Sequence, residues 1–258
     1  MTQLVGKKVV LTGAGSGIGL ALLELLLQEG PMEILAVDLQ IAKLEKYKNR
    51  IEIIQCDIGD QASIDVVIDE AVQRMGGIDL FIANAGYGYY EKIESPSWQH
   101  IESIFAVNVF SPIYSLEKMA ELCGNANFTF VTTVSVAGKM PLAGYSLYSG
   151  TRLALDGFLR AYEYEKQSNM HIMRVYPIAT KTQFFRRSGI DVVPPWPSQS
   201  PVKVARAMIN GIKTNKKAVY PSWSYRLMAI MDRFLFFIFP LYGLLEKRKF
   251  KQWLDRQE

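Results

Sequence analysis

The chain has 258 residues, of which 49% are hydrophobic, and its formal net charge is +4. This apolar fraction is ample for a buried core and excludes an intrinsically disordered chain. The surplus of charge is too small and too dispersed to indicate nucleic acid as a partner. The sequence has no Ser/Gly/Pro-rich linker and no repeat of fixed period. It therefore predicts one large α/β domain.

The two cysteines, Cys56 and Cys123, lie far apart in apolar neighbourhoods. We expect both to be buried free thiols in a reducing compartment. The chain runs directly into an apolar strand, without the charged and then apolar regions of a secretory signal. We therefore expect a cytoplasmic protein, with peripheral attachment to a membrane surface left open.

Apolar, β-rich runs alternate with helical patterns along the chain, which is typical of βαβ units on a parallel sheet. Strands are predicted at Lys8–Thr12, Glu33–Asp38, Ile51–Cys56, Ile78–Asn84, Asn127–Val134, Ile172–Tyr176 and Ala218–Tyr220. Helices are predicted at Gly17–Glu29, Ile41–Lys48, Gln61–Met75, Trp98–Cys123, Tyr145–Gln167 and Pro201–Lys213. The sequence thus predicts an α/β fold over residues 1–221, with an open, doubly wound parallel sheet of seven strands. Ligands of such a sheet bind outside the carboxyl ends of its strands.

A glycine-rich segment follows the first predicted strand and opens the first predicted helix. Its glycines would allow a tight turn, a close approach of the backbone to a pyrophosphate, and close packing of helix on strand. The free N–H groups and the dipole of the helix N-terminus favour phosphate at the same place. The residues predicted to contact a dinucleotide here are Gly13, Ser16, Gly17, Ile18 and Gly19.

An acidic residue, Asp38, ends the second predicted strand, 19 residues beyond Gly19. A carboxylate at this position accepts hydrogen bonds from the ribose hydroxyls and repels a 2′-phosphate. No Arg or Lys lies in the glycine-rich segment, and Leu39 instead of a base follows the aspartate. The sequence therefore predicts NAD as the cofactor, in preference to NADP.

A serine, a tyrosine and an arginine form the predicted catalytic group. Ser135 ends the fifth predicted strand, Tyr148 follows 13 residues later, and Arg152 comes one helical turn after the tyrosine. Because residues i and i+4 share one face of a helix, Arg152 can bring its charge to the tyrosine. A phenol is a poor acid–base group at neutral pH, and a nearby cation favours the phenolate. Tyr148 would then exchange a proton with an alcohol or carbonyl, while Ser135 binds the same substrate oxygen.

The order of these motifs resembles that of the short-chain dehydrogenase/reductase family, over about Lys7 to Tyr220. Besides the glycine-rich segment, the matching residues are Asp57, Asn84, Ala85, Gly86, Asn108, Ser135, Tyr148 and Pro177. The resemblance implies a Rossmann fold, an NAD(P)-dependent enzyme acting on CH–OH groups, and a homodimer or homotetramer. No metal site is predicted.

The resemblance also implies individual roles. Asp57 and Ile58 would meet the adenine of the cofactor, and Asn84–Gly86 would line the cofactor and steady the central sheet. Asn108 would hold a water molecule in a proton relay. Thr182 stands where the family has a threonine that contacts the nicotinamide carboxamide.

Two residues depart from the family's pattern. Arg152 stands where the family has a lysine. It offers charge and donors to the nicotinamide ribose but is never deprotonated, so it could stabilise a phenolate without itself passing on a proton. Ile178 follows Pro177 where the family has a glycine. The backbone there loses easy access to positive φ beside the nicotinamide amide.

These features leave two hypotheses about function open. The first is an NAD-dependent oxidoreductase of lipid-, steroid- or retinoid-like alcohols and their carbonyls, because Asn84–Gly88 and Val107–Phe110 resemble the branch of the family that handles apolar alcohols. The second is an NAD-binding sensor or scaffold with little or no turnover, because Arg152 replaces the catalytic lysine.

Aromatic and proline residues are frequent between the sixth and seventh predicted strands, where the family carries its substrate lobe. Gln183–Arg187 and Val192–Pro197 suit a semi-rigid lid over an apolar pocket. Tyr87, Tyr89 and Tyr90, after the fourth predicted strand, would face the same cleft. Packing against the domain is the alternative for all of these aromatic residues.

Residues 222–258 form a predicted helical extension that is apolar and basic. Its most apolar run, Phe234–Leu245, contains Pro240 and is shorter than the about 20 residues that a bilayer span needs. From Ser222 onward there are seven bases and four acids, and apolar faces flanked by bases suit a helix lying on anionic lipid. The sequence leaves open whether the extension contacts a membrane through residues 223–250, packs on the domain, closes the pocket or forms a dimer interface.

Overall fold

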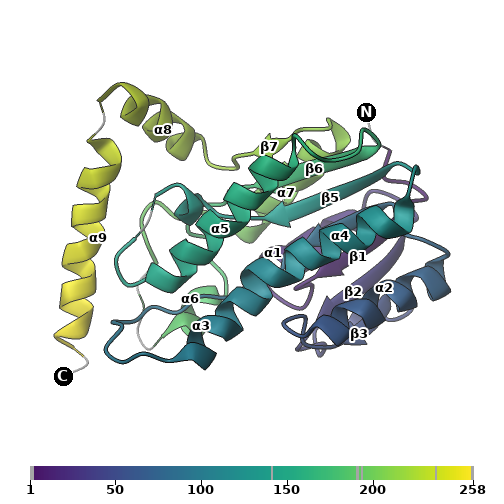
Figure 1. Cartoon of the computed structure of the whole chain (residues 1–258), viewed down its shortest axis with the longest axis horizontal. Coiled ribbons are helices and arrows are strands. Elements are labelled where there is room, and N and C mark those ends of the chain that lie inside the picture. Colours follow the sequence, from purple (N-terminus) through teal and green to yellow (C-terminus); the bar gives the residue numbers. More distant parts are fainter. Residues whose placement is uncertain (1–2, 141, 190–191, 193, 236, 257–258) are drawn as a thin grey trace.

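The computed structural model describes residues 3–140, 142–189, 192, 194–235 and 237–256, without the side chain of Arg187. At its centre lies a seven-stranded parallel sheet in the order β3-β2-β1-β4-β5-β6-β7 (Figure 1). The strands are β1 (Lys8–Thr12), β2 (Glu33–Asp38), β3 (Glu52–Gln55), β4 (Leu80–Ala83), β5 (Phe128–Thr133), β6 (Met170–Val175) and β7 (Ala218–Val219). The predicted open, doubly wound sheet is confirmed. The chain order reverses between β1 and β4, which is the point where ligands of such sheets bind.

Helices cover both faces of the sheet. The long ones are α1 (Gly17–Leu26), α2 (Gln61–Met75), α4 (Ser111–Cys123), α5 (Ser146–Tyr162) and α7 (Pro201–Lys213). Buried side chains of α1 and α7 form one apolar cluster with the sheet, whereas those of α2, α4 and α5 form a second cluster on the opposite face. The strands are therefore apolar on both sides, which explains their continuous apolar runs.

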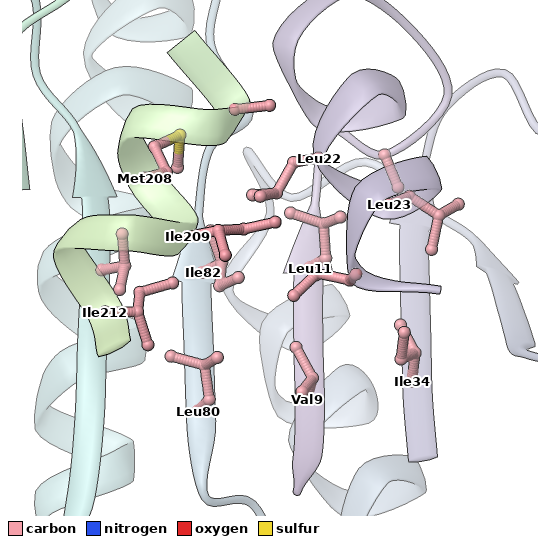
Figure 2. Close-up of a cluster of buried hydrophobic side chains, with 14 of the residues drawn as sticks. Val9, Leu11, Leu22, Leu23, Ile34, Leu80, Ile82, Met208, Ile209 and Ile212 are labelled. Carbon is pink, nitrogen blue, oxygen red and sulfur yellow. The ribbon is translucent and has the colours of Figure 1, made fainter. Parts of the chain in front are cut away.

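Strand β1 shows how alternate side chains serve the two clusters. Val9 and Leu11 point to the α1–α7 side and Val10 to the opposite side, and all three are fully buried. Figure 2 shows Leu22 of α1 and Ile209 of α7 on the same side of the sheet as Leu11. Truncating a side chain buried in this way to Ala typically costs about 2–5 kcal/mol.

One predicted helix, Ile41–Lys48, is wrong. The segment forms successive tight turns that include only a short 3₁₀ helix, Glu45–Tyr47, and the Leu44 N–H donates to the Ile41 carbonyl (2.7 Å). Eight residues are too few to form a stable helix by local propensity. Leu44 is the one side chain of the segment that is fully buried in the core, so tertiary packing does not impose a helical register.

The predicted helix Trp98–Cys123 consists of α3 (Trp98–Phe105), a π-helical turn Ala106–Phe110, and α4. Pro112 has no N–H to donate to the carbonyl four residues earlier, so the α-helical bonding pattern cannot pass through it. The Ser111 N–H instead donates to the Ala106 carbonyl, five residues back. Asn108 lies in this turn and is fully buried. π turns inside helices are frequent at functional sites.

Other element boundaries differ from the prediction by a few residues. The helix predicted at Tyr145–Gln167 ends at Tyr162, and the one predicted at Gly17–Glu29 ends at Leu26. Helix α2 has the predicted bounds because its ends carry clear signals. The Asp60 carboxylate accepts from the Ser63 N–H at its start, and Gly76 adopts the left-handed conformation at its end.

The extension forms two helices, α8 (Trp223–Leu235) and α9 (Ile238–Leu254), which lie at one edge of the molecule (Figure 1). Their axes enclose 117°, and no single helix in the described part of the chain is long and apolar enough to cross a bilayer, although the bent pair together reaches that length and composition. The inner sides of both helices contact the domain. Tyr225 stacks on Tyr220 (6.0 Å between ring centroids), and Trp253 packs on Tyr90 (5.0 Å).

Candidate active site

A cavity of about 710 Å³ lies at the carboxyl ends of the strands. Most of the predicted site residues line it, although they come from six different strand ends and two helices. These lining residues are Gly13, Ser16, Gly17, Ile18, Asp38, Asp57, Ile58, Asn84, Ala85, Gly86, Ser135, Tyr148, Arg152, Pro177 and Thr182. Two predicted residues, Gly19 and Asn108, lie behind the cavity wall and support it, as described below.

The glycine-rich segment forms a tight turn of bare backbone at one end of the cavity. Gly13 and Gly17 have φ of 68° and 56°, a conformation that side chains disfavour. A Cβ on Gly13 would lie 2.7 Å from Cα of Ala85, and one on Gly19 would overlap the Gly13 carbonyl oxygen. Ser16 precedes α1 without capping it. The free N–H groups of the first turn of α1 therefore face a cradle that side chains would fill.

Asp38 ties the end of β2 to the glycine-rich segment. Its Oδ2 accepts a hydrogen bond from the Gly15 N–H (2.7 Å), and its Oδ1 accepts one from the Gln40 N–H (2.9 Å). The carboxylate stays half-buried on the cavity wall. It therefore fixes the turn and leaves lone pairs for a ligand, because each carboxylate oxygen can accept two hydrogen bonds.

Asn84 connects the ends of three strands. Its Nδ2 donates to the carbonyls of Thr12 and Gly13 (both 3.3 Å), and its Oδ1 accepts from the Thr133 hydroxyl (3.1 Å). The side chain thus bridges the ends of β1 and β5 from the end of β4. This position agrees with the predicted role in steadying the sheet, and it fixes the cavity floor next to Gly13.

Arg152 lies inside the molecule, behind Tyr148. It is 4% exposed. Its Nη1 donates to the Thr133 carbonyl and its Nη2 to Asn108 Oδ1 (both 3.2 Å). A Cβ on Gly86 would overlap this guanidinium, so Gly86 is needed to make room for it. The Nε of Arg152 is buried and has no hydrogen-bond partner among the described residues.

Asn108 uses both ends of its side-chain amide within the protein. Its Oδ1 accepts from Arg152 and from the Tyr87 N–H (3.1 Å), and its Nδ2 donates to the Tyr87 carbonyl (2.8 Å) and the Thr151 hydroxyl (3.1 Å). Asn108 therefore holds the loop after β4 and orients Arg152. The predicted relay water, if it binds, must use the main chain of Asn108, because the side-chain amide is fully engaged.

Ser135 adopts an unusual backbone conformation at the end of β5, with φ of 115°. Such a conformation costs a residue other than glycine about 1–3 kcal/mol and persists only where the surroundings enforce it. Here the Ser135 N–H donates to the Val175 carbonyl (3.3 Å), and the Ala137 N–H donates to the Ser135 hydroxyl (3.1 Å). Ser135 lines the cavity, and its hydroxyl keeps a proton to donate. Strain of this kind is concentrated at functional sites.

Tyr148 lies in the first turn of α5, with its ring between a cation and aromatic side chains. Cζ of Arg152 lies 5.0 Å from the ring centroid, and the ring of Phe184 packs edge-on at 5.2 Å. Thr182 holds the start of the Phe184 helix, since its Oγ1 accepts from the Phe184 N–H (3.2 Å). Tyr148 and Ser135 line the same cavity, so the structure brings the predicted catalytic residues together.

Tyr145 is a residue of the site that sequence reasoning missed. It is 4% exposed, lines the cavity, and its hydroxyl has no partner in the described part of the chain. Burial raises the pKa of Tyr145 well above its ordinary value, so the hydroxyl stays a neutral donor over the physiological range. Its position three residues before Tyr148, on the same helical side, was the one signal available.

Apolar side chains line the rest of the cavity. They come from the segment after β5, from the predicted lid with its short helix α6 (Phe184–Ser188), and from the extension. These residues are Met140, Leu142, Ile178, Phe184, Phe185, Pro195, Pro197, Tyr225, Met228 and Tyr242. Of the lid, Val193 and the side chain of Arg187 lie outside the described residues. Closing of the pocket by the extension was one of the alternatives that the sequence left open, but no local pattern shows which side chains of a helix face a distant pocket.

The predicted aromatic cluster after β4 is only partly at the cavity. Tyr87 lines it, and burial raises the pKa of this tyrosine. Tyr89 and Tyr90 do not, which corrects the expectation for both. Tyr89 stacks on His100 (3.9 Å between centroids). Tyr90 is buried against Tyr145 and α9, and burial raises its pKa to about 12.

Among the described residues, no three or more His, Cys, Asp or Glu side chains lie together in a way that could hold a metal ion. Cys56 and Cys123 are free thiols and partly buried. Burial raises the pKa of both thiols. Cys56 lines the cavity beside Asp57, and its raised pKa keeps it a neutral packing residue at physiological pH.

Comparisons with known proteins agree with this geometry. A family model described as short chain dehydrogenase matches residues 7–191. A 1,2-dihydroxy-1,2-dihydronaphthalene dehydrogenase from Pseudomonas putida is 33% identical over 182 residues, covering 67% of this chain and 70% of that protein. The 17-beta-hydroxysteroid dehydrogenase 13 of Rattus norvegicus is 26% identical over 243 residues, covering 90% of this chain and 80% of that protein.

Solved structures share the fold. A short-chain dehydrogenase/reductase from Burkholderia phymatum, in complex with NAD, has a TM-score of 0.78 at 20% identity, over 91% of this chain and 96% of that one. A short-chain dehydrogenase from Sphingobium yanoikuyae, in complex with NADPH, has a TM-score of 0.75 at 21% identity, over 87% and 92% of the two chains. Because the family model spans most of the sequence, the chain belongs to the short-chain dehydrogenase/reductase family of oxidoreductases.

Proposed function

We propose that the protein is an NAD-dependent oxidoreductase that interconverts an apolar alcohol and its carbonyl. The observation that carries this proposal is the single cavity shared by three sets of residues: the glycine cradle with Asp38, the pair Ser135 and Tyr148, and the apolar wall. Relatives named as dehydrogenases of a dihydrodiol and of hydroxysteroids agree with a cyclic, largely apolar substrate.

The residues of the cavity fit a dinucleotide. The cradle at Gly13 and Gly17 would admit phosphates next to the N-terminus of α1, and Asp38 would accept hydrogen bonds from the adenosine ribose. Arg152 lines the cavity as well, and its guanidinium would lie next to the second ribose. When bound, the nicotinamide would accept a hydride from the alcohol carbon or return one to the carbonyl carbon.

The discrimination between NAD and NADP would come from Asp38. No base among the lining residues next to it could neutralise a 2′-phosphate, because its neighbour Leu39 is apolar and also lines the cavity. Desolvating a phosphate beside a carboxylate is costly. This supports NAD as the cofactor.

The protein's own residues would handle the proton and the substrate oxygen. The Ser135 hydroxyl, whose oxygen already accepts from the Ala137 N–H, would donate to the substrate oxygen and hold it. Tyr148 would take the proton of the alcohol, or supply one to the carbonyl oxygen. Cζ of Arg152 lies 5.0 Å from the centroid of the Tyr148 ring, so a fixed positive charge lies close to the group that would exchange the proton. Arg152 would not itself pass the proton on, because a guanidinium does not deprotonate.

A second function, an NAD-binding protein without turnover, draws support from one observation. The two terminal nitrogens of Arg152 are engaged by Thr133 and Asn108, and the Asn108 side chain has no donor or acceptor left for water. If the proton must pass through Arg152 and the Asn108 side chain, it cannot leave Tyr148 and the reaction cannot repeat. This hypothesis predicts binding of NADH without steady turnover.

A turnover assay separates the two functions. The full chain is incubated with a panel of apolar secondary alcohols and with NAD or NADP, and reduced cofactor is followed by absorbance. The proposal expects steady turnover with NAD that Tyr148→Phe abolishes, and Arg152→Lys should change it by no more than about tenfold. If the wild type is inactive while Arg152→Lys turns over, the second function is correct. Preference for short, charged alcohols would overturn the apolar substrate.

A further inference from the structure

The outer side of the extension is the largest run of exposed apolar side chains in the described chain. Along α8 the exposed residues Trp223, Leu227, Ile230 and Phe234 follow helical spacing, and Trp223 and Phe234 are 70% and 72% exposed. The run continues across the bend. We call the outer face the exposed side chains of Trp223, Leu227, Ile230, Met231, Phe234, Leu235, Phe237, Leu241, Leu244 and Leu245. Monomeric soluble proteins rarely expose contiguous apolar patches of this extent without a binding role.

The opposite side of the same helices packs against the domain. Tyr225 is buried in the core, Met228 and Tyr242 line the cavity, and Phe250 and Trp253 pack on Tyr90. The outer face therefore cannot turn inward without emptying these contacts. Straightening α8 and α9, whose axes enclose 117°, would likewise break contacts with the domain.

The acidic and basic residues of the extension differ in their exposure. The Asp232 carboxylate is turned inward and accepts from the Phe239 N–H (2.8 Å). Glu246 is buried and paired with Lys249 (2.6 Å). The remaining bases are exposed: Arg226, Arg233, Lys247, Arg248, Lys251 and Arg256. Asp255 is the one exposed acid among the described residues of the extension. The exposed charges in the described part of the extension are thus mostly positive.

We propose that the outer face docks on an anionic lipid bilayer, with α8 and α9 lying on the surface. Apolar side chains would enter the boundary between headgroups and acyl chains, Trp223 would sit at the headgroup level, and the bases would face the anionic headgroups. Charge favours this occupant over a second copy of the chain, because two such basic faces repel each other. The proposal does not depend on the chemistry of the cavity.

Vesicle binding tests the proposal on the full chain. Co-sedimentation is measured with vesicles of phosphatidylcholine alone and with 30% phosphatidylserine added, at low and at high salt. We expect binding that rises at least tenfold with phosphatidylserine and weakens with salt, since each base near an anionic surface contributes severalfold to binding. Absence of binding, or equal binding to both kinds of vesicle, would overturn the proposal.

Two sets of variants assign the binding to the outer face. Leu227→Asn with Phe234→Asn and Leu241→Asn should abolish it, and Arg226→Gln with Lys247→Gln and Arg248→Gln should remove the preference for phosphatidylserine. The matched controls Val66→Asn with Leu122→Asn, and Lys48→Gln with Lys203→Gln and Lys216→Gln, change exposed residues elsewhere and should bind like the wild type. If the first set instead converts a lipid-free dimer to monomers, the occupant is a second copy and the lipid proposal is wrong.

Discussion

Main chain lines one end of the cavity, whereas apolar side chains line the other end. The proposed cofactor end consists of main chain: the turn at Gly13 and Gly17, the N–H groups held by Asp38, and the carbonyls held by Asn84. The proposed substrate end consists of apolar side chains from segments far apart in the sequence, including α6, α8 and α9. A ligand common to a family can be bound by backbone that changes little, whereas a side-chain wall can change without disturbing the fold.

The largest expected effect lies where the two ends meet. Tyr148→Phe removes the hydroxyl that would exchange the proton and keeps the ring packed on Phe184 and Arg152. We expect kcat to fall by about 10²–10⁴, as is typical for the loss of a general acid–base group, with NADH binding unchanged. Turnover kinetics and NADH fluorescence titration measure the two quantities. Tyr89→Phe, outside the cavity, is the matched control, and an equal loss in that variant would contradict the assignment.

Arg152→Leu tests the support shared by both ends. Leucine would remove the Arg152 donor to the Thr133 carbonyl and one of the two donors to Asn108 Oδ1, and leaving a buried acceptor unsatisfied costs about 1–3 kcal/mol. For a chain of this size the melting temperature should fall by about 2–4 °C for each kcal/mol. Arg160→Leu, on the exposed side of the same helix, should shift it little, because surface ion pairs contribute about 0–1 kcal/mol. Similar shifts in calorimetry would show that the Arg152 contacts do not stabilise the fold.

Asp38→Asn perturbs the cofactor end alone. The amide can keep one of the two main-chain hydrogen bonds but loses the negative charge. Hydrogen bonds to charged groups contribute about 1.5–3 kcal/mol, so the ratio of kcat/KM for NAD to that for NADP should fall by about 10- to 100-fold. KM for the alcohol should not change. Asp69→Asn, on the exposed side of α2, is the control, and an unchanged cofactor ratio in Asp38→Asn would refute its role.

Met228→Ala perturbs the substrate end alone. Removing this side chain from an apolar wall should lower kcat/KM for an apolar alcohol by about 5- to 30-fold, as expected for about 1–2 kcal/mol of lost contact. The KM for NAD should stay the same. Met231→Ala, on the outer face of the same helix, should have no effect in lipid-free buffer. A change in cofactor KM in Met228→Ala would mean that the two ends are not separable.

The smallest expected effect lies outside both ends. Burial lowers the pKa of His171 on β6, so the folded protein keeps this histidine neutral at a pH where the unfolded chain already binds a proton. Stability is therefore full above the unfolded pKa of about 6.5 and falls as the pH drops below it. Urea unfolding at pH 7.5 and 5.5 should show less of this loss in His171→Gln than in the wild type. An identical pH dependence in both proteins would contradict the burial argument.

The contrast between the two ends also explains what the sequence could predict. Gly13, Gly17 and Asp38 are required by local backbone geometry, and the spacing of Tyr148 and Arg152 follows from one helical turn. Such short-range requirements leave a pattern in the sequence. Most of the strands were predicted for the same reason, since the central ones are largely apolar runs buried on both faces.

The parts that could not be predicted depend on tertiary contacts. Pro112 is visible in the sequence, but it indicates a π turn at Asn108 only if helices are known to lie both before and after that turn. The engagement of Arg152 by Thr133 and Asn108 joins residues of three different elements. Met228 and Tyr242 reach the cavity because α8 and α9 fold back on the domain. No periodicity within one segment carries that information. The predicted self-association and cytoplasmic location stay predictions.

The central claim is that both ends of the cavity deliver their ligands to Tyr148 and Ser135. A crystal structure of the full chain with NAD and an unreactive apolar alcohol analogue tests it most directly. The account predicts the analogue's oxygen within hydrogen-bond distance of Tyr148 Oη and Ser135 Oγ, its apolar part against Met228 and Phe184, and the nicotinamide ribose next to Arg152. Bound NAD with Tyr148 Oη facing protein, and the analogue elsewhere, would contradict it.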